Sequence, residues 1–234
     1  MPEPGPLASA LRTWAARGIG DAGAAAAARQ LRPATGTHTV VLVEGLSDHE
    51  AVRAVAAARG RDLAAEGVCV VPMGGATNVR RYLALLGPRG LDVRVAGLYD
   101  AAEEPVFRQA LATREHGHRR GVAAPGPDLA RSGFFACVAD LEEELIRAVG
   151  TAGVEAVVQE LGESRGLATL RHQPAHRGRS PEQQLHRFLG TTAGRKARYA
   201  RALAQRLDPT STPAPLERLL AATRLSAPPA RSPG

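Results

Sequence analysis

Five acidic side chains follow apolar, strand-like stretches of the sequence: Glu44, Asp48, Asp100, Asp140 and Glu142. Carboxylates that meet at one point repel one another unless a cation lies between them. Ligation by oxygen alone favours Mg²⁺ or Mn²⁺ over zinc. One such ion, or a pair about 4 Å apart, can activate water and stabilise the charge of a phosphodiester under in-line attack. The acids therefore predict a metal site for phosphodiester chemistry.

A simpler interpretation exists for the first two acids. Glu44 ends the apolar run of "TVVLVEGLSDHEAV", residues 39–52, and Asp48 lies four residues further on. Asp48 also suits a cap at the start of the next helix, and Glu44 could be an ordinary solvated acid. For Asp48 alone, capping explains the position as well as metal binding does. For all five acids together, the metal site is the stronger explanation.

The segments around these acids alternate between strand-like and helix-like patterns. The predicted strands are residues 39–43, 68–72, 93–98 and 134–139, and the predicted helices are residues 48–59, 78–86, 104–112 and 140–150. This alternation, with short connections, predicts an α/β fold with a parallel sheet flanked by helices. Ligands of such sheets bind beyond the carboxyl ends of the strands, where the strand order changes direction. Glu44, Asp100 and Asp140 fall at those ends.

Helical patterns flank the predicted sheet on both sides. The N-terminal pattern covers residues 8–31, with Gly18 and Gly20 dividing it, and a linker follows at 32–38. The later helices are expected at residues 154–162, 180–190, 194–207 and 214–223. We therefore divide the chain into an N-terminal helical segment and linker (1–37), an α/β domain (38–150), a basic helical extension (151–224) and a Pro-rich tail predicted to be disordered (225–234).

Positive charge is concentrated in the helical extension. Residues 165–206 hold ten Arg or Lys and a single acid, Glu182, so this segment carries +9 while the whole chain carries +7. A local basic surface beside a neutral or acidic domain is typical of contacts with a phosphate backbone, although a solvated Arg-rich helical face is the alternative. The arginines predicted to contact nucleic acid are Arg171, Arg177, Arg179, Arg195 and Arg198.

Three stretches together resemble the TOPRIM domain that topoisomerases, primases and OLD (overcoming lysogenization defect) nucleases share. They are "VVLVEGLSDHEAV", "VVPMGGATNVRRYL" and "VRVAGLYD". The chain is most similar to the OLD branch, because Asp48 follows Glu44, a Gly-Gly-x-x-Asn loop follows the second strand, and "ADLEEEL" follows a later one. The resemblance covers residues 38–150 well and residues 151–206 more loosely. It implies a Rossmann-like TOPRIM fold with a C-terminal helical extension.

By this resemblance, Glu44, Asp48 and Asp100 would hold a metal or its water, and Asp140 and Glu142 would complete a second metal position. Lys196 matches the lysine of the C-terminal helical region, which would stabilise charge on the scissile phosphate. Independently of the family, Lys196 is the only lysine among 30 basic residues. A compact ammonium in a chain that otherwise uses arginine indicates a specific chemical need.

The sequence departs from the family at one place. TOPRIM domains usually carry Asp-x-Asp after the third strand, whereas this chain has Asp100, Ala101 and Ala102. The missing carboxylate is either replaced by Glu103 or Glu104, or the site binds only one metal well.

Several classes of protein are excluded by what the sequence lacks. The P-loop pattern needs Gly-Lys-Ser/Thr, and the sole lysine lies in "GRKAR". We therefore expect a stand-alone TOPRIM domain that works either alone or with an ATPase in trans. Cys69 and Cys137 lie in apolar runs and are expected to be core thiols. With neither a signal-peptide pattern nor a run of 18 apolar residues, we expect a cytoplasmic protein without membrane contact.

These observations favour a Mg²⁺- or Mn²⁺-dependent DNA endonuclease or related phosphodiester hydrolase. Glu44 and Lys196 are its expected catalytic residues, and all five acids are its expected ligands. The alternative is a catalytically weak nucleic-acid-binding or regulatory TOPRIM module that works with an ATPase, an interpretation that Ala102 favours. Nucleotidyl transfer of the primase type is a third class, for which no sequence feature speaks. No pattern in the sequence fixes an oligomeric state.

Overall fold

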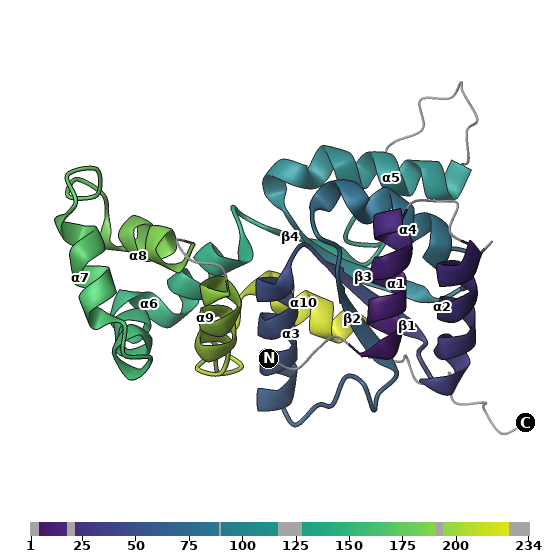
Figure 1. Ribbon diagram of the computed structural model, residues 1–234, viewed down its shortest axis with the longest axis horizontal. Helices are drawn as coiled ribbons and strands as arrows, with labels where there is room; N and C mark the ends of the chain where they lie inside the picture. Colours follow the sequence, from purple (N-terminus) through teal and green to yellow (C-terminus); the bar gives the residue numbers. More distant parts are fainter. Residues whose placement is uncertain (1–4, 18–21, 89, 117–127, 191–193, 225–234) are drawn as a thin grey trace, which may run out of the picture.

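A four-stranded parallel sheet lies at the centre of the molecule (Figure 1). The structure is a computed structural model and describes residues 5–17, 22–88, 90–116, 128–190 and 194–224. The strands are β1 (Thr39–Val43), β2 (Val68–Pro72), β3 (Arg94–Asp100) and β4 (Phe134–Cys137), in the order β2-β1-β3-β4. The predicted α/β fold with a parallel sheet is confirmed. Because the chain crosses from β2 over β1 to β3, the strand order changes direction between β1 and β3.

The central strand β1 is buried along its whole length. Its β-branched and apolar residues suit a strand that is covered on both faces. Val40 and Leu42 belong to the apolar core on one face of the sheet, and Val41 and Val43 belong to the core on the other. The end of β1, where Glu44 follows, is therefore held from both sides.

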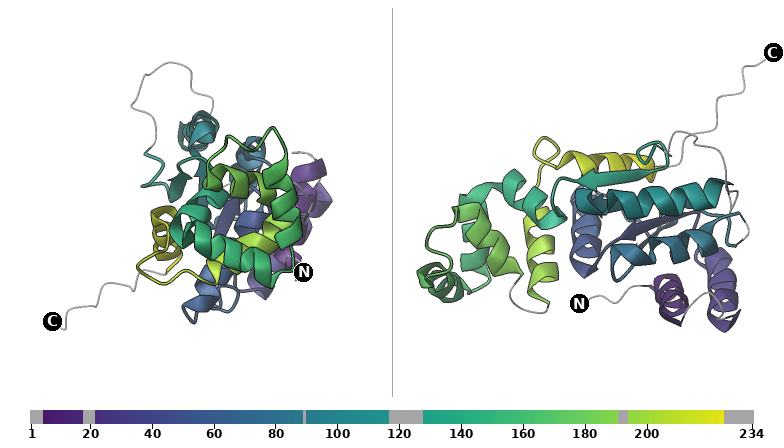
Figure 2. Two further views of the ribbon diagram at one scale, coloured as in Figure 1. Left: turned by 90° about the vertical axis from the view of Figure 1, so that its left-hand side faces the viewer. Right: turned by 90° about the horizontal axis from the view of Figure 1, so that it is seen from above.

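Helices cover both faces of the sheet, and four more form a separate helical lobe (Figures 1 and 2). One face carries α1 (Pro6–Arg17), α4 (Val79–Leu86) and α5 (Glu104–His116), with α2 (Ala22–Ala34) packed on α1. The other face carries α3 (Leu46–Ala58) and α10 (Ala214–Ala222). The helical lobe consists of α6 (Leu141–Glu160), α7 (Ser164–His172), α8 (Pro181–Leu189) and α9 (Arg195–Ala204). Two short 3₁₀ helices, η1 (Ala76–Asn78) and η2 (Ala101–Glu103), follow β2 and β3.

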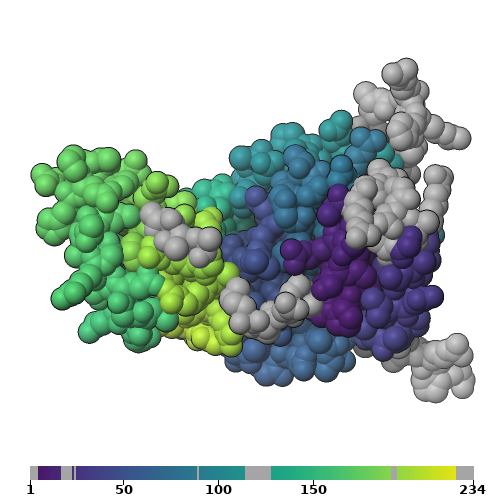
Figure 3. Space-filling model, in the orientation of Figure 1, coloured from purple at the N-terminus to yellow at the C-terminus, as the bar shows by residue number. Residues whose placement is uncertain are grey.

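The helical lobe meets the rest of the molecule through α9, which packs along α3 (Figure 1). Inside the lobe the rings of Phe188 and Tyr199 pack edge to face, with centroids 6.0 Å apart. α6 leads from β4 into the lobe and bends at Gly150, whose backbone is non-helical at φ 75° and ψ 157°. The apolar core on the α3 side of the sheet continues into the lobe, and the space-filling view shows the lobe projecting from one side of the sheet domain (Figure 3).

Several predicted boundaries were wrong. β3 runs to Asp100 and not to residue 98, so Asp100 is the last strand residue, and β4 ends at Cys137. α3 begins at Leu46, two residues early. α2 continues through Pro33 into the predicted linker, because a proline in the last turn costs only one helical hydrogen bond. α7 was not predicted at all.

Some of the remaining expectations concern residues that the structure does not describe, and others can be compared with it. The break at Gly18 and Gly20 and the tail 225–234 lie outside the described residues. Cys69 and Cys137 are free thiols; Cys137 is buried in the core, as expected, whereas Cys69 is only partly buried. α10, which the sequence division assigns to the helical extension, packs against β3 and β4. None of the described helices combines the length and apolarity that a membrane span requires.

Candidate metal centre

All five predicted carboxylates and Lys196 line one pocket of about 360 Å³ at the carboxyl ends of β1 and β3. Glu44 follows β1, Asp48 lies in the first turn of α3 and Asp100 ends β3. Asp140 and Glu142 lie at the start of α6, and Lys196 lies in the first turn of α9. The pocket is therefore shared between the sheet and the helical lobe.

The Gly-Gly-x-x-Asn loop holds the backbone of Glu44. The N–H groups of Gly74 and Gly75 both donate to the carbonyl of Glu44, at 3.0 and 3.3 Å. Both glycines have positive φ, of 74° and 118°, which other residues rarely adopt. The side chain of Asn78 donates to the carbonyls of Met73 and Gly74 and so ties the loop together. The sequence suggested no such role for this loop.

Asp48 combines the two roles that the sequence left open. Its Oδ2 accepts a hydrogen bond of 2.7 Å from the N–H of Gly45, the residue just before α3, so it does stabilise the helix start. It also lies in the shared pocket. Burial, with a smaller contribution from the carboxylates of Glu142, Asp100 and Glu44, raises the pKa of Asp48 to about 7.

Asp100 is affected in the same way. Burial and the neighbouring carboxylates of Glu44, Asp140 and Glu142 raise its pKa to about 7, and a hydrogen bond with Glu44 adds to the effect. Two buried carboxyl groups with raised pKa values in one pocket mark it as a candidate functional site.

Asp140 is the most firmly held of the five acids. It caps α6, its Oδ1 accepting from the N–H of Glu143 at 2.8 Å, and its Oδ2 lies 2.6 Å from Nε2 of His186. Burial favours its protonated form, but the hydrogen bonds from His186 and Glu143 hold the pKa of Asp140 below its ordinary value. The same contact with Asp140 raises the pKa of His186. His186 was not predicted, since no local pattern links it to a partner 46 residues away.

Glu142 is 4% exposed and faces Lys196, whose Nζ lies 3.4 Å from Glu142 Oε1. The two groups form an ion pair. Burial works against the charged ammonium, but the carboxylates of Glu142 and Asp140 raise the pKa of Lys196 overall. Lys196 therefore balances part of the negative charge that the acids bring to the pocket.

These residues suit a hard divalent cation in their chemistry. The donors are all oxygens, and burial together with the neighbouring carboxylates raises the pKa of both Asp48 and Asp100 to about 7. Within the residues that the structure describes, no three His, Cys, Asp or Glu side chains are drawn tightly enough together to form a finished metal site. The five carboxylates instead lie at separate positions along the wall of the pocket.

Comparison with known families matches residues 37–101 to the family described as "Overcoming lysogenization defect protein-like, TOPRIM domain". This part of the chain is an OLD-like TOPRIM domain. The matched segment contains Glu44, Asp48 and Asp100 and ends just before Ala102. No curated protein sequence matches the chain.

Solved structures extend the likeness beyond the matched TOPRIM segment. The C-terminal region of the OLD protein of Xanthomonas campestris pv. campestris is 27% identical, with a TM-score of 0.61, over 80% of this chain and 94% of that one. A second structure of the same region is 28% identical, with a TM-score of 0.61, over 80% and 91%. The C-terminal region of the Burkholderia pseudomallei OLD protein shares the fold at 22% identity, with a TM-score of 0.59, over 80% and 97%.

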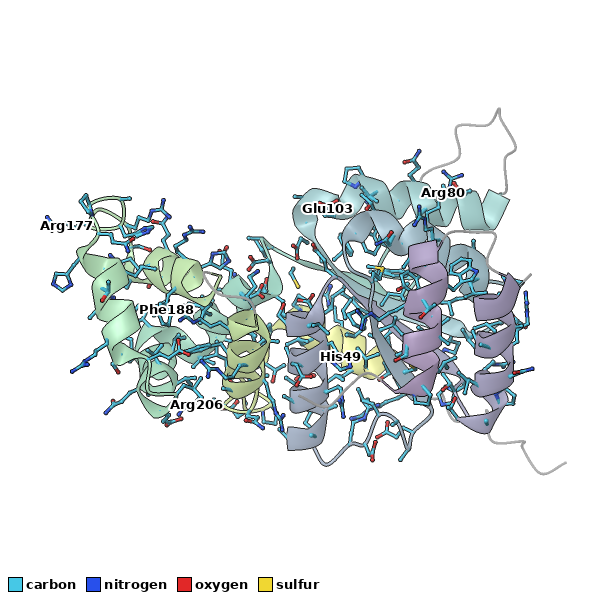
Figure 4. All side chains as sticks on the ribbon, in the orientation of Figure 1. His49, Arg80, Glu103, Arg177, Phe188 and Arg206 are labelled. Atoms are coloured by element: carbon cyan, nitrogen blue, oxygen red, sulfur yellow. The ribbon has the colours of Figure 1, made fainter. Side chains whose placement is uncertain are left out.

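The carboxylate missing from this TOPRIM domain has no replacement in the pocket. Ala102 is exposed in η2, and neither Glu103 nor Glu104 is among the residues that line the pocket. Glu104 pairs with Arg108 at 2.7 Å, and Figure 4 shows Glu103 by the start of α5. Replacement of the second Asp by Glu103 or Glu104 finds no support in this arrangement.

The five predicted nucleic-acid arginines lie in different surroundings. Arg195 and Arg198 both pair with Glu163, and Arg195 also stacks over Phe188 at 4.4 Å. Arg171 pairs with Glu155 at 2.5 Å. Arg177 and Arg179 are exposed between α7 and α8, and Figure 4 shows Arg177 at the far end of the lobe. The charge of +9 counted for residues 165–206 did not include Glu163, which lies just before that segment.

Proposed function

We propose that the chain is a Mg²⁺- or Mn²⁺-dependent phosphodiester hydrolase that cleaves DNA. The observation that carries the proposal is the convergence of five carboxylates and the sole lysine on one pocket at the switch point of a TOPRIM sheet. The match of residues 37–101 to the OLD-like TOPRIM family supports the same class of reaction.

In the proposed mechanism the five acids form the metal site. Glu44, Asp48, Asp100, Asp140 and Glu142 would hold the cation or cations, which when bound supply a Lewis acid and lower the pKa of a coordinated water. Asp48 and Asp100 would give up protons as the cation binds, because their pKa values of about 7 reflect burial and mutual repulsion.

Lys196 would act on the phosphate. Its ammonium borders the pocket beside Glu142 while 46% of the side chain remains exposed, so a phosphate oxygen can approach it. A fixed positive charge near the phosphorus stabilises the negative charge that develops during attack. Arg177 and Arg179 would hold the nucleic-acid backbone at the outer end of the lobe.

Supercoiled-plasmid cleavage tests this function. Purified protein should nick or linearise plasmid with Mg²⁺ or Mn²⁺ and not with EDTA. Glu44→Gln, which keeps the size of the side chain but removes its charge, and Lys196→Ala should each reduce the rate by roughly 10²–10³. Arg80→Ala on α4 is the control and should cleave normally. Cleavage that persists in Glu44→Gln would refute the assignment of the site.

The second candidate is a binding or regulatory TOPRIM module with a weak metal site, working with an ATPase in trans. The exposed Ala102 is the observation that favours it, since no other acid replaces the missing carboxylate in the pocket. Ala102→Asp distinguishes the two. If the wild type is inactive and Ala102→Asp gains metal-dependent cleavage, the module interpretation holds. If the wild type cleaves and Ala102→Asp changes the rate by less than about tenfold, a difference of about 1.4 kcal/mol in the barrier, the hydrolase is complete without it.

A further inference from the structure

His186 links α8 to Asp140, the residue that caps the start of α6. Its Nε2 lies 2.6 Å from Oδ2 of Asp140, a short contact of the charge-assisted kind. The buried side of α8 consists of Leu185, Phe188 and Leu189, whereas the His186 side chain is 40% exposed. Packing of α8 therefore does not explain why a histidine stands at this position.

The contact completes the fixation of the Asp140 carboxylate. Oδ1 is held by the N–H of Glu143 and Oδ2 by His186, so the carboxylate plane is set from two directions. An aspartate held at one oxygen can still rotate about its last torsion. Each oxygen keeps a further lone pair for another ligand, and Asp140 lines the shared pocket.

A contribution to the stability of the fold does not explain why His186 and Asp140 form this contact. Ion pairs between partly exposed side chains contribute little to stability. Orientation of a metal-binding carboxylate by a second side chain has a larger effect, typically 10–100-fold in metal affinity. His186 contacts Asp140 but is not among the residues that line the pocket, which fits the second role.

We propose that His186 is a positioning residue that fixes the carboxylate of Asp140 in the orientation required for divalent-cation binding, so that the helical lobe helps to build the metal centre. The inference rests on the metal site of the proposed function. It requires only an N–H donor at Nε2, which both the neutral and the protonated ring can provide.

Mn²⁺ binding, followed by electron paramagnetic resonance of the free ion, tests this directly and without reference to cleavage. His186→Ala should weaken Mn²⁺ binding about 10–100-fold. His186→Gln, whose amide nitrogen reaches the position of Nε2, should bind within about threefold of the wild type, a difference of under 1 kcal/mol. The control is His172→Ala in the same lobe, where Nδ1 of the exposed ring lies 2.7 Å from the carbonyl of Ala168.

The outcomes separate this inference from the function. Unchanged Mn²⁺ affinity in His186→Ala overturns the positioning role even if the wild type cleaves plasmid. Equal loss in His186→Ala and His186→Gln, accompanied by a lower melting temperature in both, also overturns it and indicates a structural role. Weak binding in His186→Ala, rescued by Gln, establishes the positioning role even if no cleavage occurs. A wild type that binds no Mn²⁺ refutes both proposals.

Discussion

Asp48 illustrates how one side chain can satisfy a local and a distant requirement. Its hydrogen bond from Gly45 stabilises the start of α3, yet its surroundings oppose its charge. A cap needs only an acceptor, which a protonated acid or an amide also provides. The ionised carboxylate is therefore costly for folding, and under the proposed function cation binding would offset that cost.

This conflict predicts an unusual dependence of stability on pH. The pKa of Asp48 is about 7 in the folded state and ordinarily 3.8, so between about pH 4 and 7 the unfolded chain loses this proton first and the folded state becomes less stable as pH rises. Asp48→Asn removes that loss. At pH 8 its melting temperature should exceed that of the metal-free wild type by ~2–4 °C, and at pH 4 the two should agree.

Melting curves between pH 4 and 8, recorded in EDTA, make the comparison. Glu143→Gln is the control, since Glu143 is exposed and lies outside the pocket. Mn²⁺ at pH 8 should stabilise the wild type and not Asp48→Asn. Parallel pH curves for the wild type and Asp48→Asn would contradict the prediction.

Among the elements, strands with a simple pattern were the most predictable. The bounds of β1 and β2 follow from the sequence because each is a short β-branched run between turn-forming residues. α7 was missed because Gly166 weakens its helical pattern; its Cα faces the ring of Phe188 on α8, and an added Cβ would lie 3.3 Å from that ring.

The site was predictable for a different reason. Asp100 ends β3, and Glu44 and Asp140 follow within three residues of the ends of β1 and β4. Parallel strands bring their carboxyl ends to one edge of the sheet whatever the details of packing. Lys196 came from family resemblance and from its being the only lysine. His186 and Glu163 were not predictable, because their roles depend on how α8 and α9 pack against α6, and no local pattern encodes that packing.

The bend in α6 is an element-level device that we expect to be sensitive to substitution. Gly150 has φ 75° and ψ 157°, a backbone conformation that is almost restricted to glycine, although a Cβ there would meet open space. Gly150→Ala should therefore reduce the free energy of unfolding by ~1–3 kcal/mol through backbone strain. Urea denaturation followed by circular dichroism measures this change.

Gly178 provides the matched control for Gly150. It has no positive φ and equally open surroundings, so Gly178→Ala should change stability by no more than about 0.5 kcal/mol. If Gly150→Ala were as stable as Gly178→Ala, the bend would not be constrained by the glycine, and α6 could straighten at little cost.

At the scale of the whole molecule, the pocket and the exposed arginines lie at different places on the helical lobe. The carboxylate pocket is at its junction with the sheet, where α9 packs on α3, and Arg177 is at its far end (Figure 4). A nucleic acid that contacts both must run along the lobe. Arg195 and Arg198 flank Lys196, which lines the pocket, but both are paired with Glu163. Part of their positive charge is therefore already neutralised before DNA binds.

This arrangement predicts which arginines control DNA affinity. Removing Arg177 and Arg179 together should weaken binding of a short duplex and reduce the slope of log affinity against log salt concentration by ~2, because each phosphate contact contributes about 0.9. Removing Arg195 and Arg198 should change the slope less, since Glu163 already neutralises part of their charge.

The control is a double variant of Arg29 and Arg80, on α2 and α4, which removes the same charge outside the helical lobe. Fluorescence anisotropy of a labelled duplex, recorded at salt concentrations from about 50 to about 200 mM, measures all three slopes. Equal slopes for the Arg177/Arg179 and Arg29/Arg80 variants would show that net charge, and not the end of the lobe, governs binding.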